Sequence, residues 1–230
     1  MTTTFHPAAI AAERVGFFGG TFDPPHRGHL FVAHAATVAH GLDHVVWAPA
    51  RLSPRKADAP TPGPVRAELV ALCLADAARE GDVAARAASV LLGELERPQP
   101  SYTVDSLREL TAARKAAGRT GGLYLLLGGD QLGAIETWSE LETVLALAEP
   151  VILARPGAGP EAAQRLTGCV ARGELSEPAR QRIVAGCLDP GRVDLAATEL
   201  RARLSGEARV DTTELTPGVL ERVRELRLYR

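Results

Sequence analysis

Residues 19–29 read Gly-Gly-Thr-Phe-Asp-Pro-Pro-His-Arg-Gly-His, and they decide how the rest of the chain is interpreted. The run follows an apolar, strand-like segment at 15–18 and precedes residues 30–36, which have the composition of a helix start. Backbone N–H groups around Gly19 and Gly20 can approach an anion closely, and a helix N-terminus adds partial positive charge. A strand, a glycine turn and a helix start in this order predict a phosphate-binding site.

Two histidines, His26 and His29, stand three positions apart at this helix start, so both side chains can face one ligand and supply positive charge to it. Gly28 leaves room for a ligand against the first helical turn, and Asp23 has the chemistry of a helix cap. The zincin pattern spaces its histidines four apart around a glutamate, so zinc is the weaker interpretation. The spacing also differs from the dinucleotide fingerprint and the P-loop. A capped helix with two solvated histidines is the non-functional alternative.

The pattern Gly-x-Phe-Asp-Pro-x-His-x-Gly-His at 20–29 resembles the signature of the HxGH nucleotidyltransferases, which join a nucleoside triphosphate to a phosphate-bearing acceptor. The resemblance implies that His26 and His29 bind the triphosphate and stabilise the transferred α-phosphate, without a covalent enzyme intermediate. It places further ATP contacts in this loop at Gly19, Gly20, Thr21, Phe22 and Gly28, and an acceptor contact at Asp23.

Three more motifs are similar to those of bacterial nicotinate-nucleotide adenylyltransferases. Residues 100–107, Pro-Ser-Tyr-Thr-Val-Asp-Ser-Leu, resemble that family's P-S-Y-T-x-x-T-L segment. The strand and Gly-x-Asp turn at 125–130, the pair Thr137-Trp138 and the turn at 155–157 also match, in the family's order. The resemblance implies an enzyme that transfers the adenylyl group of ATP to nicotinate mononucleotide, giving deamido-NAD and pyrophosphate in NAD biosynthesis.

The residues themselves suggest how the acceptor and the nucleoside are held. Ser101 suits the N-cap of a helix whose N–H groups at Tyr102 and Thr103 could receive a pyridine carboxylate. Trp138, at another helix entry, could stack on a flat heterocycle or cover the core; the resemblance favours the ring. Asp130 follows a continuous apolar run, so we expect it past the carboxyl end of a buried parallel strand, within reach of ribose hydroxyls.

Residues 53–56 depart from the family pattern, because Ser-Pro-Arg-Lys stands where relatives commonly carry Pro-Pro-His-Lys. Arg55 and Lys56 can both neutralise phosphate, but a guanidinium cannot shuttle protons. A solvated basic loop is the alternative interpretation of this segment. The resemblance assigns both residues to acceptor binding, and Lys56 to catalysis as well.

A second departure lies at 195–201, where the family's Ile-Ser-Ser/Ala-Thr-x-Ile-Arg appears as Leu-Ala-Ala-Thr-Glu-Leu-Arg. Thr198 can cap the helix that follows, while Ala196 removes one hydroxyl from what resembles a second anion site. A neutral hydrogen bond is worth about 1 kcal/mol, so we expect triphosphate binding to weaken several-fold rather than vanish. Arg201 joins the expected catalytic set of His26, His29 and Lys56, and the remaining expected ATP contacts are Gly128, Asp130, Arg155, Thr198 and Arg201. The interpretation requires the histidines and this late helix start to lie together.

The alternation of strand-like and helical segments predicts right-handed βαβ units, an α/β, Rossmann-like parallel sheet with helices on both faces. One nucleotidyltransferase domain is expected over 1–230, with 157–190 a helical and loop-rich subregion and 198–230 containing C-terminal helices. Strands are expected at 15–18, 44–48, 123–127 and 151–154, with an ambiguous one at 89–95. Helices are expected at 29–39, 65–78, 102–117, 139–148 and 216–228.

Composition limits the remaining options. The 230 residues are 46% hydrophobic, enough for one α/β domain with a large core. Lys and Arg total 26 against 28 Asp and Glu, so no basic field predicts nucleic acid or membrane as a partner. No apolar run approaches a membrane span and residues 1–13 lack a targeting pattern, so a soluble, cytoplasmic protein is expected. The three cysteines form no C-x-x-C pair, which argues against a disulfide framework or a zinc knuckle.

The expected substrates are ATP and nicotinate mononucleotide, with Mg²⁺ carried by ATP and no metal held by the protein. Nicotinamide mononucleotide or another phosphorylated acceptor stays open, because acid and amide differ in one group. An inactive nucleotide-binding module is the alternative of another class; Ala196 and Arg55 motivate it and the intact histidine pair opposes it. The sequence leaves the oligomeric state open, with a homo-oligomer among the options.

Overall fold

The computed structural model describes residues 4–52, 61–97, 101–153, 158–188, 195–206 and 209–230. Within these ranges six parallel strands form one sheet in the order β3-β2-β1-β4-β5-β6. The predicted Rossmann-like fold is therefore confirmed. The strands are β1 (Val15–Gly20), β2 (His44–Pro49), β3 (Ala88–Val90), β4 (Leu123–Gly128), β5 (Glu149–Leu153) and β6 (Cys187–Leu188).

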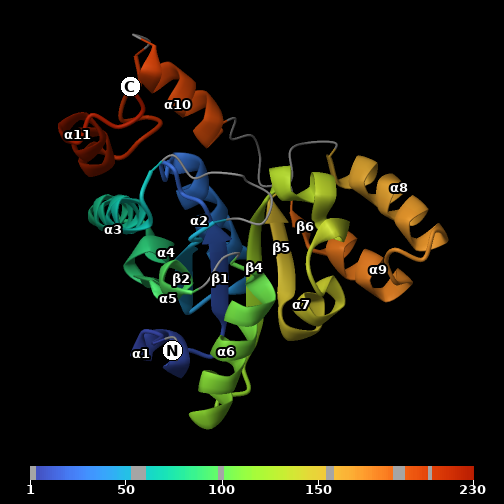
Figure 1. Cartoon of the computed structure of the whole chain (residues 1–230). Helices are drawn as coiled ribbons and strands as arrows, with labels where there is room; N and C mark the ends of the chain where they lie inside the picture. The colour runs from blue at the N-terminus through green and yellow to red at the C-terminus, as the bar shows by residue number, and fades with distance from the viewer. Residues whose placement is uncertain (1–3, 53–60, 98–100, 154–157, 189–194, 207–208) are drawn as a thin grey trace.

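Helices connect the strands and cover both faces of the sheet (Figure 1). Each expected helix is present within a few residues of its predicted bounds. In chain order the helices are α1 (Pro7–Ala11), α2 (Arg27–His40), α3 (Gly63–Arg79), α4 (Val83–Arg86), α5 (Gly93–Glu96), α6 (Thr103–Ala116), the 3₁₀ helix η1 (Gly129–Thr137), α7 (Leu141–Leu147), α8 (Ala158–Ala171), α9 (Glu177–Ala185), α10 (Ala197–Ser205) and α11 (Pro217–Glu225).

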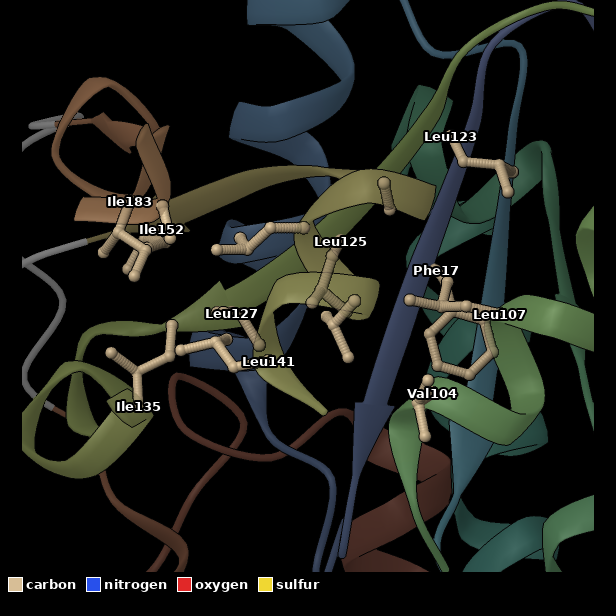
Figure 2. Packing of buried hydrophobic residues seen from close by; sticks show 14 of the residues in the cluster. Phe17, Val104, Leu107, Leu123, Leu125, Leu127, Ile135, Leu141, Ile152 and Ile183 are labelled. Atoms are coloured by element: carbon tan, nitrogen blue, oxygen red, sulfur yellow. The ribbon is translucent and has the colours of Figure 1, made fainter. Parts of the chain in front are cut away.

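Most strand residues are apolar because successive side chains enter different cores. Phe17 and Leu125 belong to the core under α6 and α7, where Figure 2 shows them near Leu107 and Leu141. Their neighbours along the chain, such as Phe18, belong to the opposite core under α2, α3, α10 and α11. Burial on both faces explains why β1 and β4 show continuous rather than alternating hydrophobicity.

The strand order reverses between β1 and β4, which pair in parallel with Phe17 opposite Leu125. The chain leaves β1 through α2 to reach β2 on one side, while β4 borders β1 on the other. In open α/β sheets, ligands bind outside the carboxyl ends of the strands at such a reversal. Gly20 and Gly128, which end the two strands, flank this position.

The last two helices lie beyond the carboxyl ends of the strands, while α8 and α9 flank β5 and β6 at the far edge (Figure 1). The N–H of Gly218 in α11 donates to the buried Asp76 carboxylate of α3 at 2.6 Å. The C-terminal residues are thereby held near the end of the sheet where ligands are expected.

Several short elements escape sequence prediction. The helices α1, α4 and α5 span four or five residues, too few to display a helical hydrophobic period. The ambiguous segment 89–95 divides into β3 and α5, and β6 contains only two residues. Within residues 139–148 the helix begins only at Leu141, because Glu140, its N-cap residue, has a left-handed backbone with φ of 49°.

Candidate active site

The two signature histidines lie together at the N-terminus of α2. His26 is the N-cap residue, and its backbone N–H donates to Nδ1 of His29 at 3.1 Å. The two ring centroids are 3.8 Å apart. The prediction that Asp23 caps this helix is wrong: the carboxylate of Asp23 instead accepts a hydrogen bond from the hydroxyl of Tyr229, at 2.5 Å. His29 takes the capping role because an acceptor at the third helical position can reach the N-cap N–H.

Burial sets the charge state of His26. Its side chain is 5% exposed, and its Nδ1 has no hydrogen-bond partner among the described residues. This burial lowers the pKa of His26 to about 4, so the imidazole is neutral near pH 7. His26 therefore carries no positive charge near pH 7 before an anion binds, and whether it supplies charge to a bound phosphate, as the sequence predicts, depends on that ligand. A neutral imidazole can still donate N–H to a phosphate oxygen, and an adjacent anion favours its protonated form.

Phe22 supports His29 from inside the core. Its ring is buried and meets the His29 ring edge-on, with centroids 5.0 Å apart. A Cβ at Gly20 would lie 2.9 Å from the Phe22 ring, so only glycine leaves it space. The backbone of Phe22 is left-handed, with φ of 50°. This conformation is energetically unfavourable for a residue with a bulky side chain. Any contact of Phe22 with ATP would use its main chain.

The surface beside Gly28 is filled by protein atoms. A Cβ there would come within 2.9 Å of Cε1 of His26 and 3.3 Å of Cβ of Leu195. The expectation that Gly28 leaves room for a ligand group is therefore corrected: the glycine admits the His26 ring and the late segment that begins at Leu195. The same contact places the start of the late helix beside the signature loop.

Arg201 joins that late helix to the loop. Its Nη1 donates to the backbone carbonyl of Asp23 at 2.7 Å, and its Nη2 donates to Oγ1 of Thr198 at 3.2 Å. Thr198 lies inside α10, so the prediction that it caps the helix is wrong. The N-cap residue is Ala196, which has no side-chain oxygen to bond the first N–H groups. Those groups remain available to an anion from a ligand.

Arg66 is a structural member of the site that sequence reasoning missed. Its buried guanidinium donates to the carbonyls of Thr21 at 2.6 Å and Ala50 at 2.8 Å, beyond the ends of β1 and β2. It also donates to the carbonyls of Thr61 and Arg51. Desolvation lowers the pKa of Arg66. An arginine on the apolar stripe of α3, in step with Leu69, Val70 and Cys73, was the signal that could have identified it.

The residues expected to bind the acceptor mononucleotide lie at the start of α6. Tyr102, not Ser101, is the N-cap residue, so the predicted capping role of Ser101 is wrong. The Ser101 hydroxyl is used elsewhere: it accepts from the N–H of Arg51 at 3.2 Å and donates to the carbonyl of Glu94 at 3.4 Å. Tyr102 lies at the surface and Thr103 begins the helix, so N–H groups of its first turn can meet a carboxylate.

A buried carboxyl group, Glu94, lies behind this helix start. Its Oε1 accepts from the hydroxyl of Ser106 in α6 at 2.6 Å, and Ser106 in turn accepts from Arg97 at 2.9 Å. Burial raises the pKa of Glu94 to about 7, although the Ser106 bond and the charge of Arg97 act in the opposite direction. The more distant carboxylates of Asp105 and Glu109 raise it slightly further.

Glu94 should make stability depend on pH. Its folded pKa exceeds the ordinary value of 4.5, so between pH 4.5 and 7 the folded state binds more protons and stability falls as pH rises. We expect Glu94→Gln to remove this penalty: relative to wild type, its free energy of unfolding should increase across that range by up to about 3 kcal/mol. Urea unfolding at pH 5 and pH 8 measures it. Glu96→Gln, on the exposed side of α5, is the control, and equal pH profiles for Glu94→Gln and wild type would contradict the assignment.

The remaining candidate site residues that the structure describes lie at or after the end of β4. Asp130 is exposed at the start of η1 and accepts from the side-chain amide of Gln131 at 2.7 Å. A Cβ at Gly128 would lie 2.7 Å from Oδ1 of Asp130, so the glycine allows the carboxylate to fold back over the strand end. Trp138 ends η1 instead of opening a helix, and it is half-buried against the core of Figure 2. That position fits the core-covering interpretation, which the sequence left open.

Three predicted site residues, Arg55, Lys56 and Arg155, lie outside the described residues. Within the described ranges, no group of three His, Cys, Asp or Glu side chains is close enough to hold a metal ion. In the same ranges no helix has the length and apolarity to cross a membrane.

Comparison with known proteins identifies the family to which the chain belongs. Residues 17–206 match the family model described as cytidylyltransferase-like. A protein of Chromobacterium violaceum named "probable nicotinate-nucleotide adenylyltransferase" is 35% identical over 94% of this chain and 99% of its own length. One with the same name from Halorhodospira halophila is 38% identical over 83% of this chain and 84% of its own. The chain belongs to the nicotinate-nucleotide adenylyltransferase family. As a member, it is a nucleotidyltransferase enzyme of NAD biosynthesis.

Solved structures share the fold of this nucleotidyltransferase. The nicotinic acid mononucleotide adenylyltransferase of Plasmodium falciparum, complexed with NaAD, superimposes with a TM-score of 0.67 at 15% identity, covering 94% of this chain and 97% of that one. The same enzyme complexed with APC gives a TM-score of 0.63 over the same shares. At this identity the likeness concerns the arrangement of strands and helices.

Proposed function

We propose that the protein transfers the adenylyl group of MgATP to nicotinate mononucleotide, releasing pyrophosphate and forming deamido-NAD. The single observation that carries this proposal is the junction of the signature loop with α10, where Arg201 donates to the Asp23 carbonyl beside the paired imidazoles. Residues from opposite ends of the chain thereby form one anion-binding surface at the strand reversal. The names of the curated relatives support the acceptor.

An oxygen of the acceptor phosphate attacks the α-phosphorus of ATP in line. The new P–O bond forms as the bond between the α-phosphorus and the bridging oxygen of pyrophosphate breaks, and pyrophosphate leaves with that electron pair. The protein orients both substrates and stabilises the charge on the transferred group. His26 and His29 would donate to the α-phosphate oxygens from the first turn of α2, whose dipole adds to the attraction. The N–H groups that follow Ala196, together with Arg201, would hold the outer phosphates. Lys56 and Arg55, which lie outside the described residues, would add further positive charge. Mg²⁺ enters as part of the ATP substrate and neutralises charge between its phosphates.

On the acceptor side, the first N–H groups of α6 at Tyr102 and Thr103 would receive the carboxylate of nicotinate, with Ser101 fixing the start of this helix through Arg51 and Glu94. Asp130 would accept from a ribose hydroxyl. Helix N-termini favour anions, so this arrangement prefers a carboxylate to a neutral amide.

A direct comparison of acceptors tests this assignment. With ATP and equal concentrations of the two mononucleotides, we expect kcat/KM measured by pyrophosphate release to be about tenfold higher for nicotinate than for nicotinamide mononucleotide, because charge-assisted hydrogen bonds are the stronger kind. A preference for the amide would contradict the acceptor assignment. Binding of ATP without turnover on either acceptor would favour the inactive nucleotide-binding module.

A further inference from the structure

The C-terminal end of the chain reaches into the signature loop. The hydroxyl of Tyr229 donates to Oδ1 of Asp23 at 2.5 Å, and the Thr61 side chain makes a hydrogen bond to the same hydroxyl. Tyr229 and Leu228 also pack against the core beneath α2 and α3. Two residues 206 positions apart in the sequence are therefore in direct contact beside the candidate anion site.

The backbone that delivers Tyr229 is held in an unfavourable conformation. Arg227 has φ of 52° and Tyr229 has φ of 63°, both in the left-handed region that residues with side chains seldom adopt. Each such residue costs free energy and persists only where the surrounding contacts impose it. Burial and the Asp23 bond raise the pKa of Tyr229 above its ordinary range, so the hydroxyl keeps its proton and remains a donor.

Asp23 depends on this donor. Its side chain is 2% exposed, and its other oxygen, Oδ2, has no partner among the described residues. The main chain of the same residue supplies the carbonyl that holds Arg201 at 2.7 Å. Tyr229, Asp23 and Arg201 therefore form a chain of contacts from the C-terminus to the residue expected to meet the triphosphate.

We propose that Tyr229 is a positioning residue for ATP binding, which fixes Asp23 and through it the location of Arg201. The identity of the ligand rests on the function proposed above. Without the hydroxyl, the buried carboxylate of Asp23 loses its donor, and Arg201, which already donates to the backbone carbonyl of the same residue, is a cation able to replace it. A guanidinium drawn to the carboxylate is withdrawn from the phosphates.

The test is Tyr229→Phe, which keeps the ring and removes only the hydroxyl. We expect the KM for ATP to rise roughly ten- to a hundredfold, the loss typical of a hydrogen bond to a charged group. The KM for nicotinate mononucleotide should rise much less, because Asp23 is only one of the expected acceptor contacts and the helix start at Tyr102 and Thr103 is unchanged. A purely structural role would lower the melting temperature without separating the two KM values. Tyr124→Phe, at the opposite end of the sheet on β4, is the control and should leave both KM values unchanged.

A double-mutant cycle with Asp23→Asn tests whether the effect passes through Asp23. If it does, the double variant should bind ATP no more weakly than Asp23→Asn alone; independent, multiplying losses would overturn the proposal. Calorimetric titration with ATP alone measures ATP affinity without turnover, so it tests the role of Tyr229 separately from the proposed reaction. Wild-type enzyme without turnover would refute the acceptor assignment, whereas equal ATP affinity of wild type and Tyr229→Phe would refute the role of Tyr229.

Discussion

His29→Ala should lower kcat by about a hundred- to ten-thousandfold, the loss expected when a donor to the transferred group is removed. The substitution also deletes the acceptor that caps α2, because Nδ1 of His29 receives the N–H of His26. A loss of activity could then reflect a frayed helix. His29→Gln separates the two effects, since glutamine at this position can still accept from the N-cap N–H.

We expect His29→Gln to lose as much turnover as His29→Ala while keeping more of the wild-type melting temperature. Pyrophosphate release and thermal unfolding, measured on the same samples, provide both numbers. His34→Gln serves as the control, because His34 lies on the same helix but turns towards Asp82, with 3.2 Å between Nδ1 and the carboxylate. Turnover that survives in His29→Gln at the wild-type level would remove this imidazole from the mechanism.

Arg66→Met should have the largest effect on stability. The guanidinium satisfies carbonyls from three segments, and its loss leaves buried acceptors without donors. We expect the free energy of unfolding to fall by about 3–5 kcal/mol, as for other buried charged groups that lose a partner. Because Thr21 and Ala50 border the site, kcat/KM should also fall at least tenfold at temperatures where the variant is folded.

Arg114→Met is the matched control for this second experiment. Arg114 is equally buried and donates to the carbonyls of Ala9, Ala12, Glu13 and Gly121, but it lies at the amino ends of the strands. We expect a similar loss of stability with kcat/KM within about threefold of wild type. If Arg66→Met does not fold, Arg66→Lys can be measured in its place. It keeps the positive charge but lacks the planar guanidinium that donates to several carbonyls at once. Equal losses of kcat/KM at Arg66 and Arg114 would show that the position of Arg66 at the site has no special effect.

The sequence predicted the fold from two local signals. Continuous apolar runs such as 123–127 identify strands buried on both faces, and the helices between them impose parallel pairing. The signature loop was equally readable, because glycines, prolines and histidines at fixed spacing act on their immediate neighbours. Capping was predicted less well: His26, Tyr102 and Ala196 stand at the N-caps where Asp23, Ser101 and Thr198 were expected.

Two of the three capping errors share one cause. Each predicted cap was chosen from side-chain chemistry within a few residues, but two of these side chains make hydrogen bonds to partners far away in the chain. Asp23 binds Tyr229, and Ser101 binds Arg51 and Glu94. Thr198 is the second residue of its helix and pairs with Arg201, three residues along the same helix. A cap is worth about 1 kcal/mol, so a tertiary hydrogen bond of similar strength can displace it.

The sequence by itself determined the family, the order of strands and helices and the chemistry of the signature loop, because each depends on neighbours within one supersecondary unit. Only the tertiary structure revealed three features: the neutral state of His26, the hydrogen bonds of Arg66 to the carbonyls beyond β1 and β2, and the contact of Tyr229 with Asp23. Burial and the meeting of distant segments are properties of the packed molecule, and no local pattern encodes which carbonyl or carboxylate a buried donor will find.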